Sequence, residues 1–144
     1  MAASDPSSPN SVLLFNLFSP FFVSLSCSSA LERKKNIEEL IFYLTTWNIG
    51  SPTPKFTLNG HLKGVNCIAY FNSSDKTYLL SGSDEFTAKI WDCEIRTCVQ
   101  TLKGHLHNVS ALCVLPELSI VITASEDGTS RLSLVLTKDF ALSR

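Results

Sequence analysis

The spacing of apolar residues along the chain changes from a helical to an alternating pattern near residue 45. Before that point, apolar residues recur at i, i+3, i+4 and i+7, at Ile37, Leu40, Ile41 and Leu44. This spacing places side chains on one face of a helix. Ser29 and Glu32 precede the apolar face with the spacing of a capping box, in which both side chains satisfy free amides at a helix start. The pattern predicts a short amphipathic helix at residues 30–45.

After residue 45, apolar and polar residues alternate in short runs separated by turn-forming residues. Such alternation is typical of β-strands with one buried face. The runs predict strands at residues 65–71, 78–83, 87–92 and 97–102, and then at 109–115, 120–125 and 129–136. Short turns between successive runs favour antiparallel neighbours. We therefore expect two antiparallel sheets, at residues 65–102 and 109–136, within a β-rich region at residues 46–136.

The chain repeats the same residues at nearly the same spacing. Trp47 and Trp91 are 44 residues apart, and so are His61 and His105. A second set of positions repeats with an offset of 42, namely Ser81-Gly82-Ser83 and Thr123-Ala124-Ser125. The smaller offset makes the turn at residues 72–77 two residues longer than its counterpart. A period of about 40–45 residues, with Gly-His at one end and Trp-Asp at the other, is the signature of WD repeats.

The chain thus resembles WD-repeat proteins, and the resemblance implies an all-β fold. The expected architecture is a partial WD-repeat β-propeller of about two four-stranded antiparallel blades, preceded by the short N-terminal helix. In this family a hydrogen-bonded group of four side chains often locks each blade, because a fully connected polar network pins neighbouring strands. The resemblance implies His61, Ser81, Glu85 and Trp91 for the first repeat, and His105, Thr123, Asp127 and Ser133 for the second.

Both groups of four depart from the family pattern. Glu85 stands where Asp is usual, and Ser133 stands where Trp is usual. Truncating a buried Trp in a core costs about 3–5 kcal/mol. We therefore expect the second blade to depart from the family pattern after Arg131.

Residues 1–29 differ in composition from the rest of the chain, with Asp5 as their one charged residue. The apolar run at residues 12–23, followed by small residues, has the form of a signal peptide, which would make the chain secretory. No Lys or Arg precedes the run, which favours instead a disordered, apolar and Ser-rich leader. An integral membrane span is excluded, because about 20 apolar residues are needed and Asn16 and Pro20 interrupt the run.

Composition and charge argue against several classes of function. The formal net charge of −1 gives no excess of basic residues of the kind that binds nucleic acid. The five cysteines are odd in number and lack zinc spacing, which favours reduced thiols in a cytosolic protein. His105 and His107 could bind a metal, but no third ligand is near them in the sequence. Ser81, Asp84 and His61 could suggest a catalytic triad, but the repeat already accounts for each of them. We expect a non-enzyme with no catalytic residues, no cofactor and no metal.

A more specific resemblance covers the residues from Trp47 to Arg131. It lies in the motifs Trp47-Asn48-Ile49-Gly50-Ser51-Pro52, Lys63-Gly64-Val65-Asn66-Cys67, Cys98-Val99-Gln100-Thr101-Leu102, His107-Asn108-Val109-Ser110 and Ser125-Glu126-Asp127-Gly128-Thr129. These motifs are similar to consecutive middle repeats of the N-terminal propeller of coatomer beta-prime subunits. Residues 1–46 and the tail after Arg131 depart from that family.

The coatomer resemblance implies a non-enzymatic scaffold in protein transport between the Golgi apparatus and the endoplasmic reticulum. It implies other coatomer subunits and cargo tails as partners, in the cytoplasm and peripherally on Golgi membranes and coated vesicles. The family reads cargo with earlier blades, so no residue here is assigned to cargo. A generic WD-repeat adaptor, such as a ubiquitin-ligase substrate receptor, and an inactive truncated gene product are the alternatives. Two blades leave faces and edges open, since at least about three repeats are needed for stability, so we expect self-association.

Overall fold

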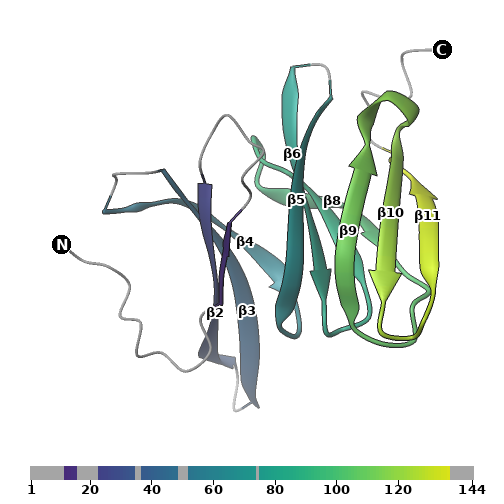
Figure 1. Ribbon diagram of the computed structural model, residues 1–144. Coiled ribbons are helices and arrows are strands. Elements are labelled where there is room, and N and C mark those ends of the chain that lie inside the picture. Colours follow the sequence, from purple (N-terminus) through teal and green to yellow (C-terminus); the bar gives the residue numbers. More distant parts are fainter. Residues whose placement is uncertain (1–11, 16–22, 35–36, 49–51, 74, 137–144) are drawn as a thin grey trace. The chain divides into compact units, whose positions relative to one another are not determined.

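A computed structural model of the chain describes residues 12–15, 23–34, 37–48, 52–73 and 75–136 (Figure 1). The regular secondary structure in these ranges consists of β-strands and one short 3-10 helix, with no α-helix. The chain forms two compact units, Met1–Gly64 and Val65–Arg144. Within the described residues, no helix is both long enough and apolar enough to cross a membrane.

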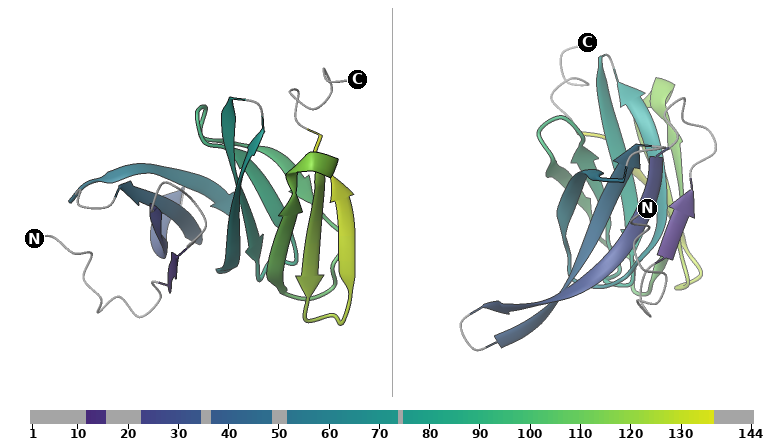
Figure 2. Two further views of the ribbon diagram at one scale, coloured as in Figure 1. Left: turned by 45° about the horizontal axis from the view of Figure 1, so that its top comes forward. Right: turned by 90° about the vertical axis from the view of Figure 1, so that its left-hand side faces the viewer.

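The N-terminal unit contains a four-stranded antiparallel sheet in the order β1-β2-β3-β4. Its strands are β1 (Val12–Phe15), β2 (Val23–Lys34), β3 (Ile37–Asn48) and β4 (Pro54–His61). Strand β1 pairs with residues 24–27 of β2, and β4 pairs with residues 42–47 of β3. Beyond these pairs, β2 and β3 continue as a two-stranded hairpin up to Lys34 and Ile37 (Figure 2).

The helix predicted at residues 30–45 is wrong, because the described residues of this stretch belong to β2 and β3. The stretch from Ile41 to Trp47 is rich in β-branched and aromatic residues, which favour the pleated backbone of a strand. Twelve residue pairs join β2 to β3, and β4 pairs with the other edge of β3. Leu44, which the helical spacing placed on an apolar face, is buried within the strand. Strand pairing has therefore overridden the local signal for a helix.

Strands also form within residues 1–29, the stretch expected to be a disordered leader. Residues 12–15 form β1, and residues 23–29 form the first part of β2. The other residues of this stretch lie outside the described part of the chain, as does the tail at residues 137–144.

Two sheets make up the C-terminal unit. The first has the order β5-β6-β7-β8, with β5 (Val65–Ser73), β6 (Lys76–Ser83), β7 (Ala88–Asp92) and β8 (Thr97–Leu102). The second has the order β11-β10-β9, with β9 (Val109–Leu115), the 3-10 helix η1 (Pro116–Leu118), β10 (Ile120–Ser125) and β11 (Ser130–Leu134). All neighbouring strands are antiparallel. The predicted class, a partial propeller of antiparallel blades, is confirmed, although the second sheet has three strands in the described residues instead of four.

The register of the two sheets reproduces the difference between the 44-residue and 42-residue offsets. Phe71 pairs with Tyr78 across the β5–β6 turn, and Leu115 pairs with Ile120 across the β9–β10 turn. Six residues, 72–77, therefore lie between the two members of the first pair, where strand pairing continues to Ser73 and Lys76, and four residues, 116–119, lie between the members of the second. The extra two residues lie at the end of a hairpin, so the sheets keep equivalent pairings on either side.

The core of the C-terminal unit lies where β9 packs beside β5 and β6 (Figure 1). Its buried members are Phe71, Tyr78, Leu80, Ala88, Ile90, Val109, Val121 and Val135. Gly82 permits the close approach of the sheets, because a Cβ atom there would lie 2.6 Å from Val109 Cγ1 and 2.7 Å from Cys67 Sγ. Fully burying a side chain such as that of Val109 stabilises a fold by about 1.5–3 kcal/mol. The contact between the two sheets is thus a main source of stability in this unit.

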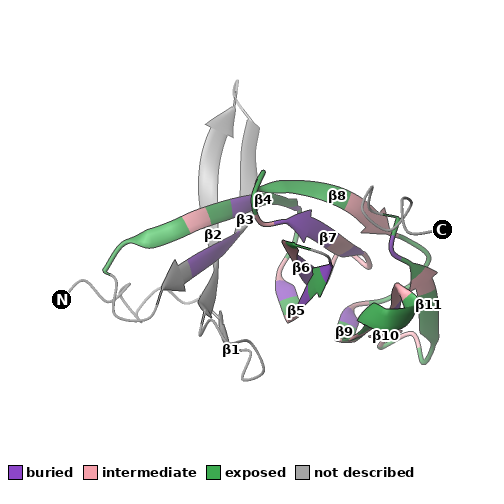
Figure 3. Ribbon diagram, turned by 90° about the horizontal axis from the view of Figure 1, so that it is seen from above, coloured by how far each residue is buried: buried purple, intermediate pink, exposed green. Residues whose placement is uncertain are grey.

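Burial differs between the inner and outer strands of the first sheet. Most of β7 is buried, whereas the first half of β8 is exposed at the edge of the sheet (Figure 3). The strand inside the sheet is therefore more buried than the strand at its β8 edge.

Candidate functional site

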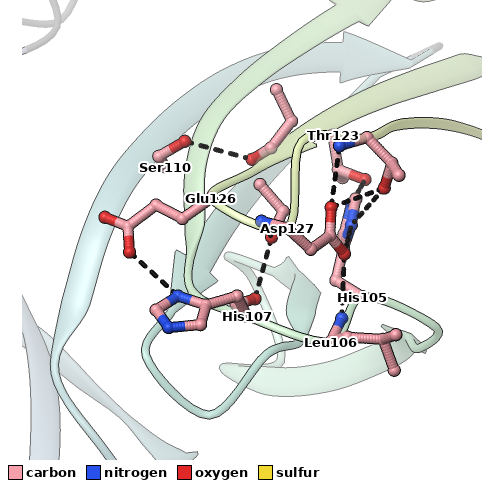
Figure 4. A network of polar contacts seen from close by, with 10 residues as sticks. His105, Leu106, His107, Ser110, Thr123, Glu126 and Asp127 are labelled. Carbon is pink, nitrogen blue, oxygen red and sulfur yellow. Dashed lines mark hydrogen bonds and ion pairs between the residues drawn. The ribbon is translucent and has the colours of Figure 1, made fainter.

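A buried hydrogen-bond network joins the loop between β8 and β9 to strand β10 and to the β10–β11 turn (Figure 4). His105 Nδ1 lies 2.9 Å from Asp127 Oδ2, and His105 Nε2 lies 2.8 Å from Thr123 Oγ1. An ionised carboxylate can only accept, so Nδ1 donates to Asp127, and a neutral imidazole then accepts at Nε2 from the Thr123 hydroxyl. Both His105 and Thr123 are buried. The network therefore ties a loop, a strand and a turn together without leaving these buried polar atoms unpaired.

Asp127 is the main acceptor of this network. Its Oδ2 atom also accepts from the Leu106 amide at 2.9 Å. Its Oδ1 atom accepts from the amide and the hydroxyl of Thr129, at 2.8 Å and 2.6 Å. These donors, with the Thr129 hydroxyl as the largest cause and the Leu106 amide next, hold the pKa of Asp127 well below its ordinary value of 3.8. The carboxylate is therefore ionised at neutral pH and holds the turn in one conformation.

The second histidine of this segment lies at the surface. His107 Nδ1 is 2.9 Å from Glu126 Oε2, and the two side chains are 54% and 53% exposed. The imidazole ring stacks on Phe86 with 5.7 Å between the ring centroids. An exposed pair of this kind contributes about 0–1 kcal/mol. His107 thus supports the turn from outside, while His105 forms the buried network.

In the first repeat, Trp91 and Ser81 form a buried polar pair. Trp91 Nε1 donates to Ser81 Oγ at 2.8 Å, and the two residues are 1% and 0% exposed. Trp91 lies directly opposite Leu79 in the β6–β7 register, so Ser81 is its diagonal neighbour. The hydrogen bond satisfies the indole N–H while the ring fills the core.

Glu85 belongs to a turn that shares several hydrogen bonds with the turn of Asp127. Its Oε1 atom lies 2.5 Å from Thr87 Oγ1 and 3.7 Å from Lys89 Nζ. The Glu85 amide donates to Ser83 Oγ at 3.2 Å, as the Asp127 amide donates to a Ser hydroxyl at 3.1 Å. In both repeats, an acidic residue therefore pairs with the Thr two positions later.

His61 is the last residue of β4 and is buried. It belongs to the N-terminal unit, whereas Ser81, Glu85 and Trp91 belong to the C-terminal unit. A hydrogen bond from His61 to these residues stays a prediction, drawn from the equivalent contact between His105 and Thr123.

Ser133 lies at the register position of the missing tryptophan. It pairs with Val121 across β10 and β11, as Trp91 pairs with Leu79 across β6 and β7. The structure brings His105, Thr123 and Asp127 together, while the Ser133 hydroxyl makes no hydrogen bond within the described residues. The second repeat therefore has three of its four expected members in contact.

The other chemically reactive side chains are separate from one another. No group of three or more His, Cys, Asp or Glu residues in the described ranges could hold a metal ion. Cys67, Cys93, Cys98 and Cys113 are free thiols, and burial raises the pKa of Cys67 to about 11. A thiol with so high a pKa is a weak nucleophile at neutral pH. Asp84, considered above as a triad member, instead accepts from Asn66 Nδ2 at 2.7 Å.

Sequence reasoning missed three residues with structural hydrogen bonds: two threonines in these turns and a glutamine that joins the two sheets. Thr87 and Thr129 had a usable signal, because they recur 42 residues apart and each follows its acidic partner by two positions. Gln100 had none: its amide donates to the Leu134 carbonyl at 3.0 Å and accepts from the Leu136 amide at 2.8 Å. This contact between sheets depends on how the two sheets are placed, which local pattern does not encode.

These networks recur with the repeat, and comparison with known proteins identifies the repeat. The family model "WD domain, G-beta repeat" matches residues 52–92 and 96–132, which together make up more than half of the chain. The chain belongs to the WD-repeat family.

Within this family, the resemblance to coatomer beta-prime subunits is confirmed. The chain is 52% identical over 101 residues to "Coatomer subunit beta'-2" of Arabidopsis thaliana, which covers 70% of this chain and 10% of that protein. It is 55% identical over 89 residues to "Coatomer subunit beta'" of Rattus norvegicus, covering 62% of this chain and 10% of the relative. The chain is 38% identical over 104 residues to "Probable coatomer subunit beta'" of Schizosaccharomyces pombe, and the match covers 68% of this chain and 13% of that protein. The chain thus spans about a tenth of the length of the curated relatives it matches.

Proposed function

We propose that this chain is a non-enzymatic WD-repeat scaffold of a coatomer-type vesicle coat, acting in protein transport between the Golgi apparatus and the endoplasmic reticulum. The main support is how the repeat uses its polar side chains. His105 is engaged with Asp127 and Thr123, and Trp91 is engaged with Ser81. Side chains engaged in this way stabilise the shape of a sheet, which suits a binding scaffold better than a reaction site.

We infer that the partners are other coatomer subunits. The relatives named above are themselves coatomer subunits, and the chain exposes apolar residues at the edges of both C-terminal sheets. Ile95, just before β8, is 63% exposed, and Val99 on β8 is 40% exposed. Leu132 and Leu134 on β11 are 69% and 56% exposed. Exposed apolar edges favour contact with another protein surface. The proposed location is cytoplasmic and peripheral on Golgi membranes and coated vesicles, and cargo tails are assigned to no residue of this chain.

Affinity purification from cells tests this proposal. The full chain carries a C-terminal tag, and the matched control is a Gly82→Val variant, in which the new side chain meets Val109 at the contact between the sheets. We expect coatomer subunits to be recovered with the parent chain and not with the variant. We also expect the parent chain to overlap with a Golgi marker in imaging. A protease-resistant, folded parent chain that recovers no more coatomer than the variant would contradict the proposal.

A further inference from the structure

We propose that residues 12–61 form a third blade of the same repeat, with an 11-residue insertion in its second hairpin. In this blade, Ser26 and Trp47 hold the positions that Ser81 and Trp91 hold in the next blade. The family match begins only at residue 52, so the repeat is here extended to strands β1 to β3, of which only the end, from Trp47, had a counterpart at the 44-residue offset. It rests on strand register and is independent of the proposed transport role.

The outer half of the N-terminal sheet repeats the outer half of the next sheet at an offset of 44. Strand β3 pairs with β4 at Trp47 with Pro54, and β7 pairs with β8 at Trp91 with Cys98. The register shift also recurs, between residues 46 and 47 in one sheet and between residues 90 and 91 in the other. An irregularity at the same place is a more specific likeness than regular pairing, because a bulge sets the local twist of a strand pair.

The inner half of the N-terminal sheet repeats its counterpart at an offset of 55. Residues 12–15 of β1 pair with residues 24–27 of β2, as residues 67–70 of β5 pair with residues 79–82 of β6. Across the central pair of strands, Ser24 lies opposite Trp47, as Leu79 lies opposite Trp91. All four strands of the N-terminal sheet therefore have the neighbours and the register of β5 to β8.

The two offsets differ because of one segment. Sixteen residues, 28–43, connect the paired positions Cys27 and Leu44. Five residues, 83–87, connect the equivalent positions Gly82 and Ala88. The excess of 11 residues equals the difference between the offsets of 55 and 44, and it forms the part of the β2–β3 hairpin that extends past β1 and β4 (Figure 2).

The sequence agrees with this assignment once the insertion is removed. The motif Leu25-Ser26-Cys27-Ser28 stands at the register of Leu80-Ser81-Gly82-Ser83. Leu44 and Thr46 of β3 are buried, as are their equivalents Ala88 and Ile90 of β7. A third blade matters physically, because at least about three stacked repeats are needed before a repeat array is stable on its own.

Exchange of the two indole protons tests the assignment, since Trp47 and Trp91 are the only tryptophans in the chain. The full-length chain is labelled with ¹⁵N, and a Trp47→Phe variant assigns the two signals. We expect Ser26→Ala to accelerate exchange of the Trp47 indole proton about tenfold, the effect of losing one hydrogen bond. Ser81→Ala should accelerate exchange of the Trp91 indole proton by a similar factor. Each of the two variants should leave the exchange rate of the other indole proton unchanged. Ser26→Thr, which keeps the hydroxyl, should restore slow exchange at Trp47.

Ser29→Ala is the matched control, because Ser29 lies in the inserted segment. An equal effect of Ser26→Ala and Ser29→Ala on Trp47 would overturn the assignment. So would a Trp47 indole proton that exchanges as fast as free tryptophan in the parent chain. A second variant replaces residues 28–43 with the five residues Ser83–Thr87, and it should keep slow exchange at Trp47. Loss of protection at Trp47 in this variant, with Trp91 still protected, would also overturn the assignment.

Discussion

Phe86 and Gly128 occupy the same left-handed backbone position in successive repeats, with φ angles of 70° and 79°. Each amide donates at 3.2 Å to the carbonyl of the serine three residues earlier, Ser83 or Ser125. Only glycine adopts this conformation without a steric cost, and an L-residue pays about 1–2 kcal/mol for it. The first repeat therefore carries a strained residue where the second carries the favoured one.

Replacing Gly128 with Ala should lower the free energy of unfolding by about 1 kcal/mol. No heavy atom lies within 4 Å of the added Cβ position, so the loss reports backbone strain alone. Urea unfolding measures it. Phe86→Ala is the control, because it keeps a non-glycine residue at positive φ: it should add no backbone cost, and any loss of stability it shows reports the stack with His107. Unchanged stability of Gly128→Ala would show that the turn relaxes to another conformation.

Gly82 and Val109 should behave as a coupled pair. The Cβ atom of Gly82→Ala would lie 2.6 Å from Val109 Cγ1, and overpacking of a core costs about 1–3 kcal/mol. Val109→Ala removes the clashing methyl group, so the double variant should lose less stability than the sum of the two single variants. A complete cycle of urea unfolding curves checks this. Strict additivity would mean that the two sheets do not approach each other here.

Stability should fall with pH in a way that depends on Asp127. A carboxyl group whose pKa is lowered by folding stabilises the protein above its ordinary value of 3.8 and loses this contribution as the pH falls below that value. The difference in unfolding free energy between the parent and Asp127→Asn should thus be larger at pH 7 than at pH 3. Thr129→Val removes the strongest donor and should flatten the dependence. A difference that stays constant between these pH values would contradict the network.

The leucines of β11 should drive self-association. Leu132 and Leu134 are 69% and 56% exposed on a strand at the edge of the described sheet. Charged residues on an edge strand oppose pairing with another chain. We expect the parent chain to form larger species as concentration rises in analytical ultracentrifugation, and Leu132→Lys with Leu134→Lys to reduce them. Leu106→Lys, at a 79% exposed position in a loop, is the control. An equal effect of the loop variant would remove β11 from the explanation.

Local pattern was sufficient for the elements whose neighbours in sequence are also their neighbours in space. Strands β9 and β10 have the predicted bounds, because each belongs to a hairpin with clear alternation and a proline-containing turn. The repeat also indicated which residues would meet, and His105 does contact Thr123 and Asp127. The internal repeat helps because a structural role assigned to a residue in one copy can be checked at the equivalent residue of the other.

Prediction failed where strand pairing outweighed local propensity. The segment around Leu40 and Leu44 has helical spacing, yet it lies in β3 between β2 and β4. If residues 28–43 contain an insertion, the shift of 11 residues also hides the likeness between Ser26 and Ser81 from a search at a fixed period. The contact of Gln100 with Leu134 could not be predicted for another reason. It joins two sheets, and the local sequence pattern does not show how the sheets are placed.

The polar residues of the repeat hold its strands and turns together. The most direct test is a double-mutant cycle in urea between His105→Phe and Thr123→Val, whose side chains are 2.8 Å apart in the buried network. We predict a coupling energy of about 1 kcal/mol, with both single variants less stable than the parent. Losses that add to within about 0.3 kcal/mol, or single variants as stable as the parent, would contradict the claim.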